Sequence, residues 1–107
     1  MSKINFTYED QQFTLEFSRR TVQQMEKAGF SLDGVANQPA TYIPMLFQGA
    51  FLMHHQRTKE ATINAIFNCI EEKDELMSAL IDMYREPLET MFDDPEDEGK
   101  KVSWKKE

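Results

Sequence analysis

Apolar residues occupy every second position in the N-terminal part of the chain, where polar residues separate them. The alternating residues are Ile4, Phe6, Tyr8, Phe13, Leu15 and Phe17. A period of two with aromatic and branched side chains predicts two strands of a β-hairpin with one apolar face. The residues between the strands include no glycine, so the pattern leaves the type of turn open.

The next stretch carries the start and stop signals of a helix. Ser18 is a suitable N-cap, Val22 and Met25 point inward, and Gly29 follows the last turn. If Gly29 takes the left-handed position after the helix, Phe30 closes a Schellman motif against Met25. Residues 31–39 contain glycine, asparagine and proline, and predict a loop with one short helical turn.

Residues 41–56 form the most apolar stretch, and a helix is expected to begin near Thr41 with Pro44 in its first turn. One apolar stripe runs through positions 43, 46, 47 and 50, and a second runs through positions 42, 45, 49, 52 and 53. This helix is therefore predicted to be apolar on more than one side.

Two further helices are predicted, the first capped by Thr58 and the second by Asp74. Pro87 removes one helical hydrogen bond, so the last helix is expected to kink there or to end and restart. These elements predict an α+β fold in which an N-terminal hairpin packs on about four helices. Residues 1–92 are expected to form a single globular domain.

The composition changes at residue 93. Residues 93–98 hold five acidic side chains, and residues 99–107 hold four lysines, one acid and Trp104. A segment with so few apolar side chains buries too little surface to offset its ordering entropy, so residues 93–107 are expected to form a mobile, charged tail.

The overall charge limits the classes of partner. A net charge of −7 argues against a nucleic-acid partner, because phosphate contacts need clustered Lys and Arg. No apolar run approaches the roughly 20 residues of a membrane helix, and the N-terminus lacks the apolar core of a signal peptide. A single cysteine, Cys69, forms no internal disulfide, and this is typical of a reducing cytoplasm.

The candidate chemistry is sparse. His54 and His55 are adjacent, so on a helix they point about 100° apart and do not chelate one ion as residues at i and i+4 do. Capping and packing roles are expected for the pair, and a packed core thiol is expected for Cys69. No phosphate-binding loop, nucleophile elbow or metalloprotease motif is present, so neither an enzyme nor a cofactor is expected.

Three segments resemble, in order and spacing, a family of small siphophage and prophage proteins of Gram-positive bacteria. They are "FTLEFSRRTVQQMEKAGF", "PATYIPMLFQGAFLMHHQRTK" and "KDELMSALIDMYREPLETMF", and the similarity covers about residues 4–92. The family looks like tail assembly chaperones. The family pattern has a glycine turn between the first two strands, where this chain has Asp10, Gln11 and Gln12.

The resemblance implies a function without catalysis. Such a chaperone coats the long apolar tape-measure protein, keeps it from aggregating and brings the major tail tube protein. It acts in the bacterial host cytoplasm and is absent from the mature virion. A homo-oligomer and a frameshifted longer form both stay open.

Eight Phe and seven Met are many for 107 residues, and two interpretations stay open. Either the helix from Thr41 is enclosed by the hairpin and the other helices, or part of it is exposed for an apolar partner. For the second interpretation, the expected contact residues are Met45, Phe47, Phe51, Leu52, Met53, Tyr84, Leu88 and Phe92.

Three other functions compete with the chaperone. A structural head-tail connector or tail component predicts a large stable oligomer within purified particles. A DNA mimic requires a folded row of carboxylates, and a metal-dependent enzyme would have to use His54, His55 and Cys69.

Overall fold

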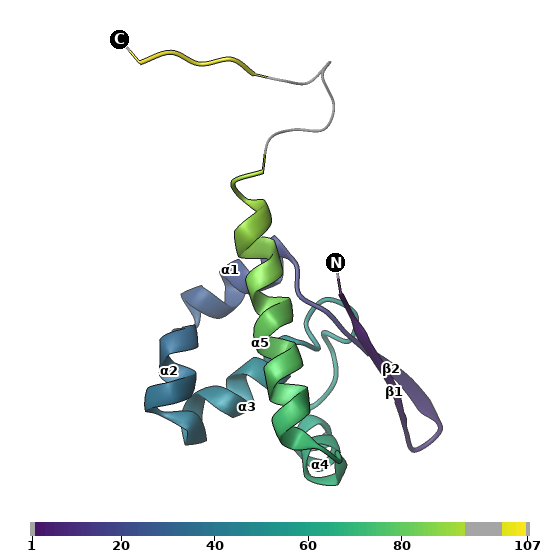
Figure 1. The fold of residues 1–107 in the computed structure, drawn as a ribbon. Coiled ribbons are helices and arrows are strands. Elements are labelled where there is room, and N and C mark those ends of the chain that lie inside the picture. The colour runs from purple at the N-terminus through teal and green to yellow at the C-terminus, as the bar shows by residue number, and fades with distance from the viewer. Residues whose placement is uncertain (1, 94–101, 107) are drawn as a thin grey trace.

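The computed structural model describes residues 2–93 and 102–106 and confirms the α+β fold (Figure 1). A two-stranded antiparallel hairpin comes first and five helices follow, one more than expected. The hairpin consists of β1 (Ile4–Tyr8) and β2 (Gln11–Leu15). In its register Ile4 lies opposite Leu15, and Tyr8 lies opposite Gln11.

The turn of the hairpin forms without glycine. Glu9 and Asp10 both have positive φ values, 49° and 64°, and this is the conformation that a two-residue type I′ turn requires. Such a turn matches the right-handed twist of the two strands. Glu9 and Asp10 therefore hold a backbone conformation that costs free energy for most side chains, and Asn-Gly at these two positions would lower that cost.

Helix α1 (Arg19–Lys27) begins and ends as its sequence predicts. The hydroxyl of Ser18 accepts a hydrogen bond from the backbone N–H of Thr21, and the Thr21 hydroxyl accepts one from the N–H of Ser18. At the other end Gly29 has φ 100°, and the N–H of Phe30 donates to the carbonyl of Met25 at 3.0 Å. This is the expected Schellman closure.

The middle of the chain differs from the prediction in its helix bounds. Helix α2 (Leu32–Asn37) is followed by α3 (Pro39–Gly49), which begins two residues before Thr41 and ends before the two histidines. Pro39, with its fixed φ and no N–H, occupies the first turn. Pro44 consequently lies inside the helix, and residues 50–54 form turns.

The predicted caps of the last two helices are wrong. Helix α4 (Glu60–Cys69) has Lys59 as N-cap and no side-chain capping bond, so Thr58 does not cap it. Helix α5 (Lys73–Thr90) places Asp74 in its first turn and continues through Pro87 to Thr90. Helix α5 packs along its length against the other elements. The stability gained from this packing outweighs the stability lost with the hydrogen bond that Pro87 removes.

Helix α5 stands between the hairpin and the group formed by α1, α2 and α3, and α4 lies near its first turn (Figure 1). The core at this junction draws buried side chains from β2 and from α1, α3, α4 and α5. It is rich in aromatic rings: Phe51 lies 5.2 Å from Phe47 and 5.8 Å from Phe13 between ring centroids. The aromatic residues noted in the sequence therefore hold the hairpin onto the helices.

The outer edge of β2 is covered by the segment that follows α3. The backbone N–H of Thr14 donates to Nε2 of His55 at 2.9 Å, and the N–H of Glu16 donates to the carbonyl of Ala50 at 3.2 Å. Both groups point away from β1, so they would otherwise lack a partner in the sheet. The hairpin is thus fastened along the β2 edge.

The predicted tail lies partly outside the described residues, which exclude 94–101 and 107. Residues 102–106 have no regular secondary structure and are exposed. In the part of the chain that the structure covers, no helix combines the length and the apolar character needed to cross a bilayer.

Candidate binding surfaces

The eight predicted contact residues do not lie on one surface. Three of them are core residues: the exposed fraction is 1% for Phe47, 1% for Phe51 and 2% for Tyr84. The hairpin covers Phe51. Phe17 and Phe30 pack edge-on against Tyr84, with ring centroids 5.5 Å and 5.1 Å from that of Tyr84. These three side chains are not available to a partner in this fold, and that part of the prediction is wrong.

Two further predicted residues, Met45 and Leu52, line a shallow depression of about 180 Å³ between α1 and α3. Its floor includes Met25 and Phe30, which are buried. The second apolar stripe of α3 therefore reaches the surface only at its margin. Met53 is 44% exposed, but it stands in the turn beside polar and histidine side chains rather than in this depression.

The last two predicted residues, Leu88 and Phe92, lie at the C-terminal end of α5. Leu88 lines a groove between α1 and α5 of about 320 Å³, which we call the α1–α5 groove. Its lining residues are Arg19, Val22, Gln23, Glu26, Pro87, Leu88 and Met91. The Arg19 guanidinium donates to the Thr90 carbonyl at 2.7 Å and so ties the end of α5 to the start of α1.

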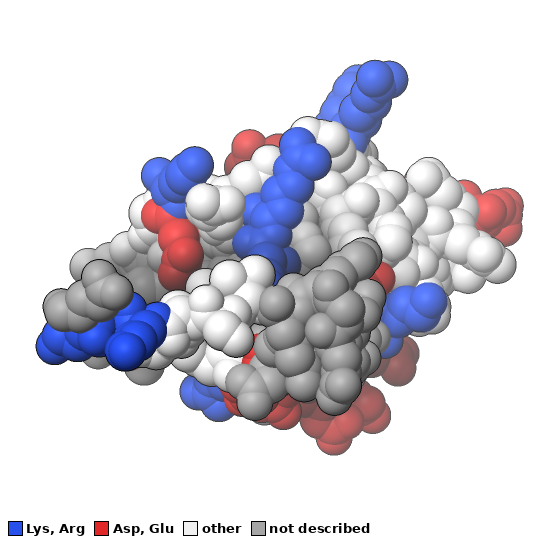
Figure 2. Space-filling view, turned by 90° about the horizontal axis from the view of Figure 1, so that it is seen from above, with Lys and Arg blue, Asp and Glu red and all other residues white. Residues whose placement is uncertain are grey.

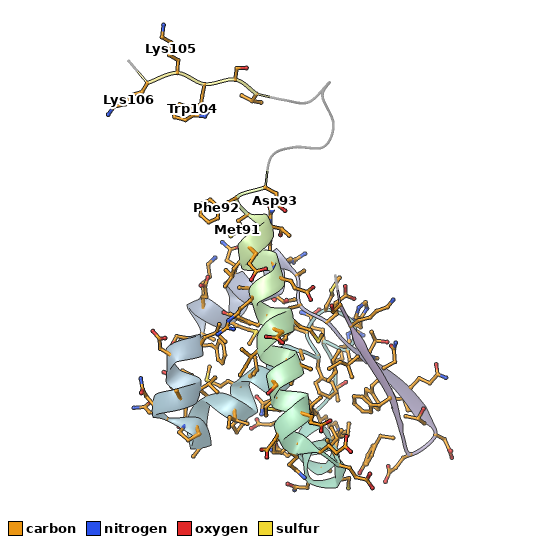
Figure 3. All side chains as sticks on the ribbon, in the orientation of Figure 1. Met91, Phe92, Asp93, Trp104, Lys105 and Lys106 are labelled. Atoms are coloured by element: carbon orange, nitrogen blue, oxygen red, sulfur yellow. The ribbon has the colours of Figure 1, made fainter. Side chains whose placement is uncertain are left out.

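Met91 and Phe92 lie at this end of α5 (Figure 3), and Met91 also lines the α1–α5 groove. They are 55% and 90% exposed, so two large apolar side chains face solvent next to an apolar groove. The sequence prediction missed Met91, although it lies three residues after Leu88, a spacing that places both on one helical face. Of the predicted residues, Leu88 thus lines the α1–α5 groove together with the unpredicted Met91, and Phe92 is exposed directly after Met91 in the chain.

Charged side chains are scattered over the described part of this end of the molecule. Figure 2 looks down on the end where α5 stops, and uncharged residues separate most of the Lys and Arg side chains in view. The Asp and Glu side chains in view lie mostly toward its margins. Among the described residues in this view, the basic groups do not form the continuous patch that a phosphate backbone requires.

The two histidines perform separate structural tasks. Nε2 of His54 lies 2.8 Å from Oε1 of Glu16, and Nε2 of His55 accepts the N–H of Thr14. Burial, and then the neighbouring His54, lower the pKa of His55, so the neutral acceptor form is favoured. In residues 2–93 and 102–106 no three His, Cys, Asp or Glu side chains are grouped to hold a metal ion.

Cys69 is not the core thiol that the sequence predicts. It is the last residue of α4 and is exposed. Cys69 lines a third groove, of about 410 Å³, between β1 and the α4–α5 junction, which we call the hairpin groove. No local sequence pattern indicates this groove, because it is formed by strand and helix residues more than 55 positions apart.

Two titrating groups reflect the packing around α5. Burial, and then the Glu26 carboxylate, raise the pKa of Tyr84 to about 12. At the surface, the N–H of Ser2 donates to Oε2 of Glu86 at 2.8 Å, and hydrogen bonding from Ser2 lowers the pKa of Glu86. The start of β1 is thus tied to the second half of α5.

The described residues form a small α+β domain with an N-terminal hairpin, five helices and three grooves that are lined in part by apolar side chains. The chain belongs to the family described as "Domain of unknown function (DUF5055)", whose model matches residues 1–107. That description names no activity. No curated protein and no solved structure matches the chain.

Proposed function

We propose that the protein is a phage tail assembly chaperone that binds apolar helical segments of the tape-measure protein. The observation that carries the proposal is the exposed pair Met91 and Phe92 beside the α1–α5 groove. The resemblance of three sequence segments to phage tail assembly chaperones supports the proposal. Under this proposal the protein acts in the host cytoplasm without catalysis, helps to recruit tail tube protein and is absent from the mature virion.

The physical argument rests on the cost of leaving large apolar side chains in water. Contiguous exposed apolar patches on small proteins commonly mark contact sites, and methionine adapts its shape to varied apolar partners. A groove between two helices suits an amphipathic or apolar helix, which binds through residues at spacings of three and four. A partner helix laid along the α1–α5 groove would cover Leu88, Met91 and Phe92 together.

The charged rim of the groove suits a partner that must be released. Arg19 and Glu26 line its edges with opposite charges, so polar positions of a bound helix meet charged groups rather than more apolar surface. Such a rim contributes orientation more than affinity. Reversible binding is what an assembly chaperone needs, because it leaves when the tail tube polymerises.

The test is co-expression with the neighbouring tape-measure gene. We expect the wild-type protein to make the tape-measure product soluble and to co-purify with it. The double variant Met91→Asp, Phe92→Asp is expected to lower co-purification about tenfold or more, because it places charge on the contact surface. Circular dichroism is expected to be unchanged, since both positions are exposed.

A matched control carries the same change in charge elsewhere. Asn64 and Asn68 are exposed on α4, and the double variant Asn64→Asp, Asn68→Asp is expected to co-purify as the wild type does. If both double variants retain the tape-measure product, the α1–α5 groove is not the contact surface. If the wild-type protein is found within purified virions as a ring, the head-tail connector replaces the chaperone.

A further inference from the structure

The hairpin groove has an apolar floor and an acidic rim. Its floor is formed by β1 on one side and by the end of α4 and the start of α5 on the other, with Ile4, Phe6, Ile66, Ile70 and Leu76 among its lining residues. Glu71, Glu72 and Glu75 also line it, and all three are exposed. An apolar side chain accompanied by a positive charge is therefore the chemistry that this groove accepts.

Lys73 does not neutralise this rim. Its ammonium group donates to the Ile70 carbonyl at 2.9 Å and lies 5.6 Å from the centre of the Phe67 ring. Within residues 2–93 and 102–106, the ion pair that the structure shows joins His54 and Glu16, far from these carboxylates in sequence. The three glutamates of the groove are thus open to a cationic ligand.

The strand beside the groove also has an open edge. Because Tyr8 and Gln11 close the two-residue turn, the N–H and C=O groups of Asn5 and Thr7 point away from β2. The hydrogen bonds found among the described residues leave these backbone groups unused, whereas the β2 edge is covered by His55 and Ala50. An open strand edge next to an apolar groove is the arrangement that accepts an added peptide strand.

Residues 102–106 have the complementary chemistry. Val102 is 86% exposed and Trp104 is 85% exposed, and Lys105 and Lys106 follow directly. In Figure 3 Trp104 and Lys106 lie on one side of this segment and Lys105 on the other, as in an extended chain. One side of the segment thus offers an aromatic side chain and a lysine two residues apart.

We propose that residues 102–106 of a second copy of this chain dock in the hairpin groove. The segment adds to the open edge of β1, Trp104 enters the apolar floor, and Lys106 meets the carboxylates of the rim. The occupant is identified by charge complementarity and by the match between an extended segment and an open strand edge. This inference does not rest on the proposed function.

The positions of groove and segment favour exchange between two copies. Glu72 and Glu75 lie at the start of α5, whereas residues 102–106 lie beyond its C-terminal end (Figure 3). Eighteen residues of helix separate these ends by about 27 Å, so the segment would have to run back along the whole of α5 to reach the groove of its own chain. When two copies exchange their segments about a two-fold axis, both grooves are filled and the assembly closes as a dimer.

The test uses the full chain, in which Trp104 is the only tryptophan. We expect sedimentation to show a dimer that dissociates on dilution, with tryptophan emission at shorter wavelength in the dimer than in the monomer. Trp104→Ala is expected to weaken dimerisation about tenfold or more, since buried tryptophans dominate such contacts. Lys106→Glu is expected to weaken dimerisation as well, and adding Glu75→Lys is expected to restore it.

The control variant is Phe92→Ala, which removes an equally exposed aromatic outside both the groove and the segment. It is expected to dimerise as the wild type does. A protein that stays monomeric with solvent-exposed tryptophan at all concentrations overturns the proposal, and so does a dimer that Trp104→Ala leaves intact. A monomer with protected tryptophan would place the segment in its own groove and would equally overturn the exchange.

Discussion

The Nε2 atom of His55 accepts the backbone N–H of Thr14 at 2.9 Å, and the imidazole lies 5.0 Å from the ring of Phe13. A residue beyond α3 thereby satisfies the outer edge of β2. This bond needs an unprotonated Nε2, because a protonated nitrogen donates rather than accepts.

Acidification is expected to destabilise the fold through His55. Its pKa in the fold is lowered from 6.5, first by burial and then by His54, so the unfolded chain binds the proton more readily. The contribution of His55 to stability is therefore present above pH 6.5 and is lost as the pH falls through the lower folded value. Urea unfolding at a series of pH values from about 7.5 to about 5 measures this slope.

The variant His55→Gln keeps an acceptor and removes the titration, so its free energy of unfolding should vary less with pH than that of the wild type. His54→Gln is the neighbouring control and should retain most of the dependence. A slope that His55→Gln leaves unchanged would contradict this role for His55.

Gly29→Ala is expected to destabilise the protein by about 1 kcal/mol through the backbone alone. Gly29 has φ 100°, and a Cβ atom there would meet nothing within 4 Å. A clash with other parts of the protein is thus excluded as the cause of any loss, which comes from the local backbone conformation. Chemical denaturation measures the change, and Gly29→Asn should lose less, because asparagine tolerates the left-handed region better.

Phe51 and Phe92 are expected to differ sharply when each is replaced by alanine. Phe51 is 1% exposed and contacts three other phenylalanine rings, so Phe51→Ala should cost about 3–5 kcal/mol in the free energy of unfolding. Phe92 is 90% exposed, so Phe92→Ala should change it by less than about 0.5 kcal/mol. Equal losses at the two positions would refute the burial described above.

Replacing the turn residues Glu9 and Asp10 by Asn and Gly is expected to stabilise the hairpin by about 0.5–1 kcal/mol. Both residues have positive φ, and Asn-Gly is the preferred pair for this turn. Thermal unfolding measures the gain. Gln12→Gly, in the adjoining strand, is the control and should destabilise instead, because glycine weakens a strand interior.

Local signals in the sequence predicted the elements whose ends are set by neighbouring residues. The hairpin follows from strict alternation, and α1 follows from Ser18 at one end and Gly29 at the other. The predicted N-caps of α4 and α5 were wrong. Thr58 and Asp74 have suitable side chains, but the start of each helix depends on where the chain enters the packed core.

The candidate surfaces were predicted only in part, for a physical reason. Periodicity shows that a side chain is apolar and which helical face it shares, and it places Leu88 and Phe92 among the predicted contact residues. It does not show which element covers that face.

The amino-acid sequence by itself determined the hairpin, the helical content and the acidic character, because strand alternation, caps and charge are properties of neighbouring residues. Only the tertiary structure decided that Phe47, Phe51 and Tyr84 are core and that Cys69 is exposed beside a groove. Burial depends on contacts between segments distant in sequence. The hairpin covers the turn after α3, where Phe51 lies, and α5 packs against α3 itself. No local pattern encodes that choice.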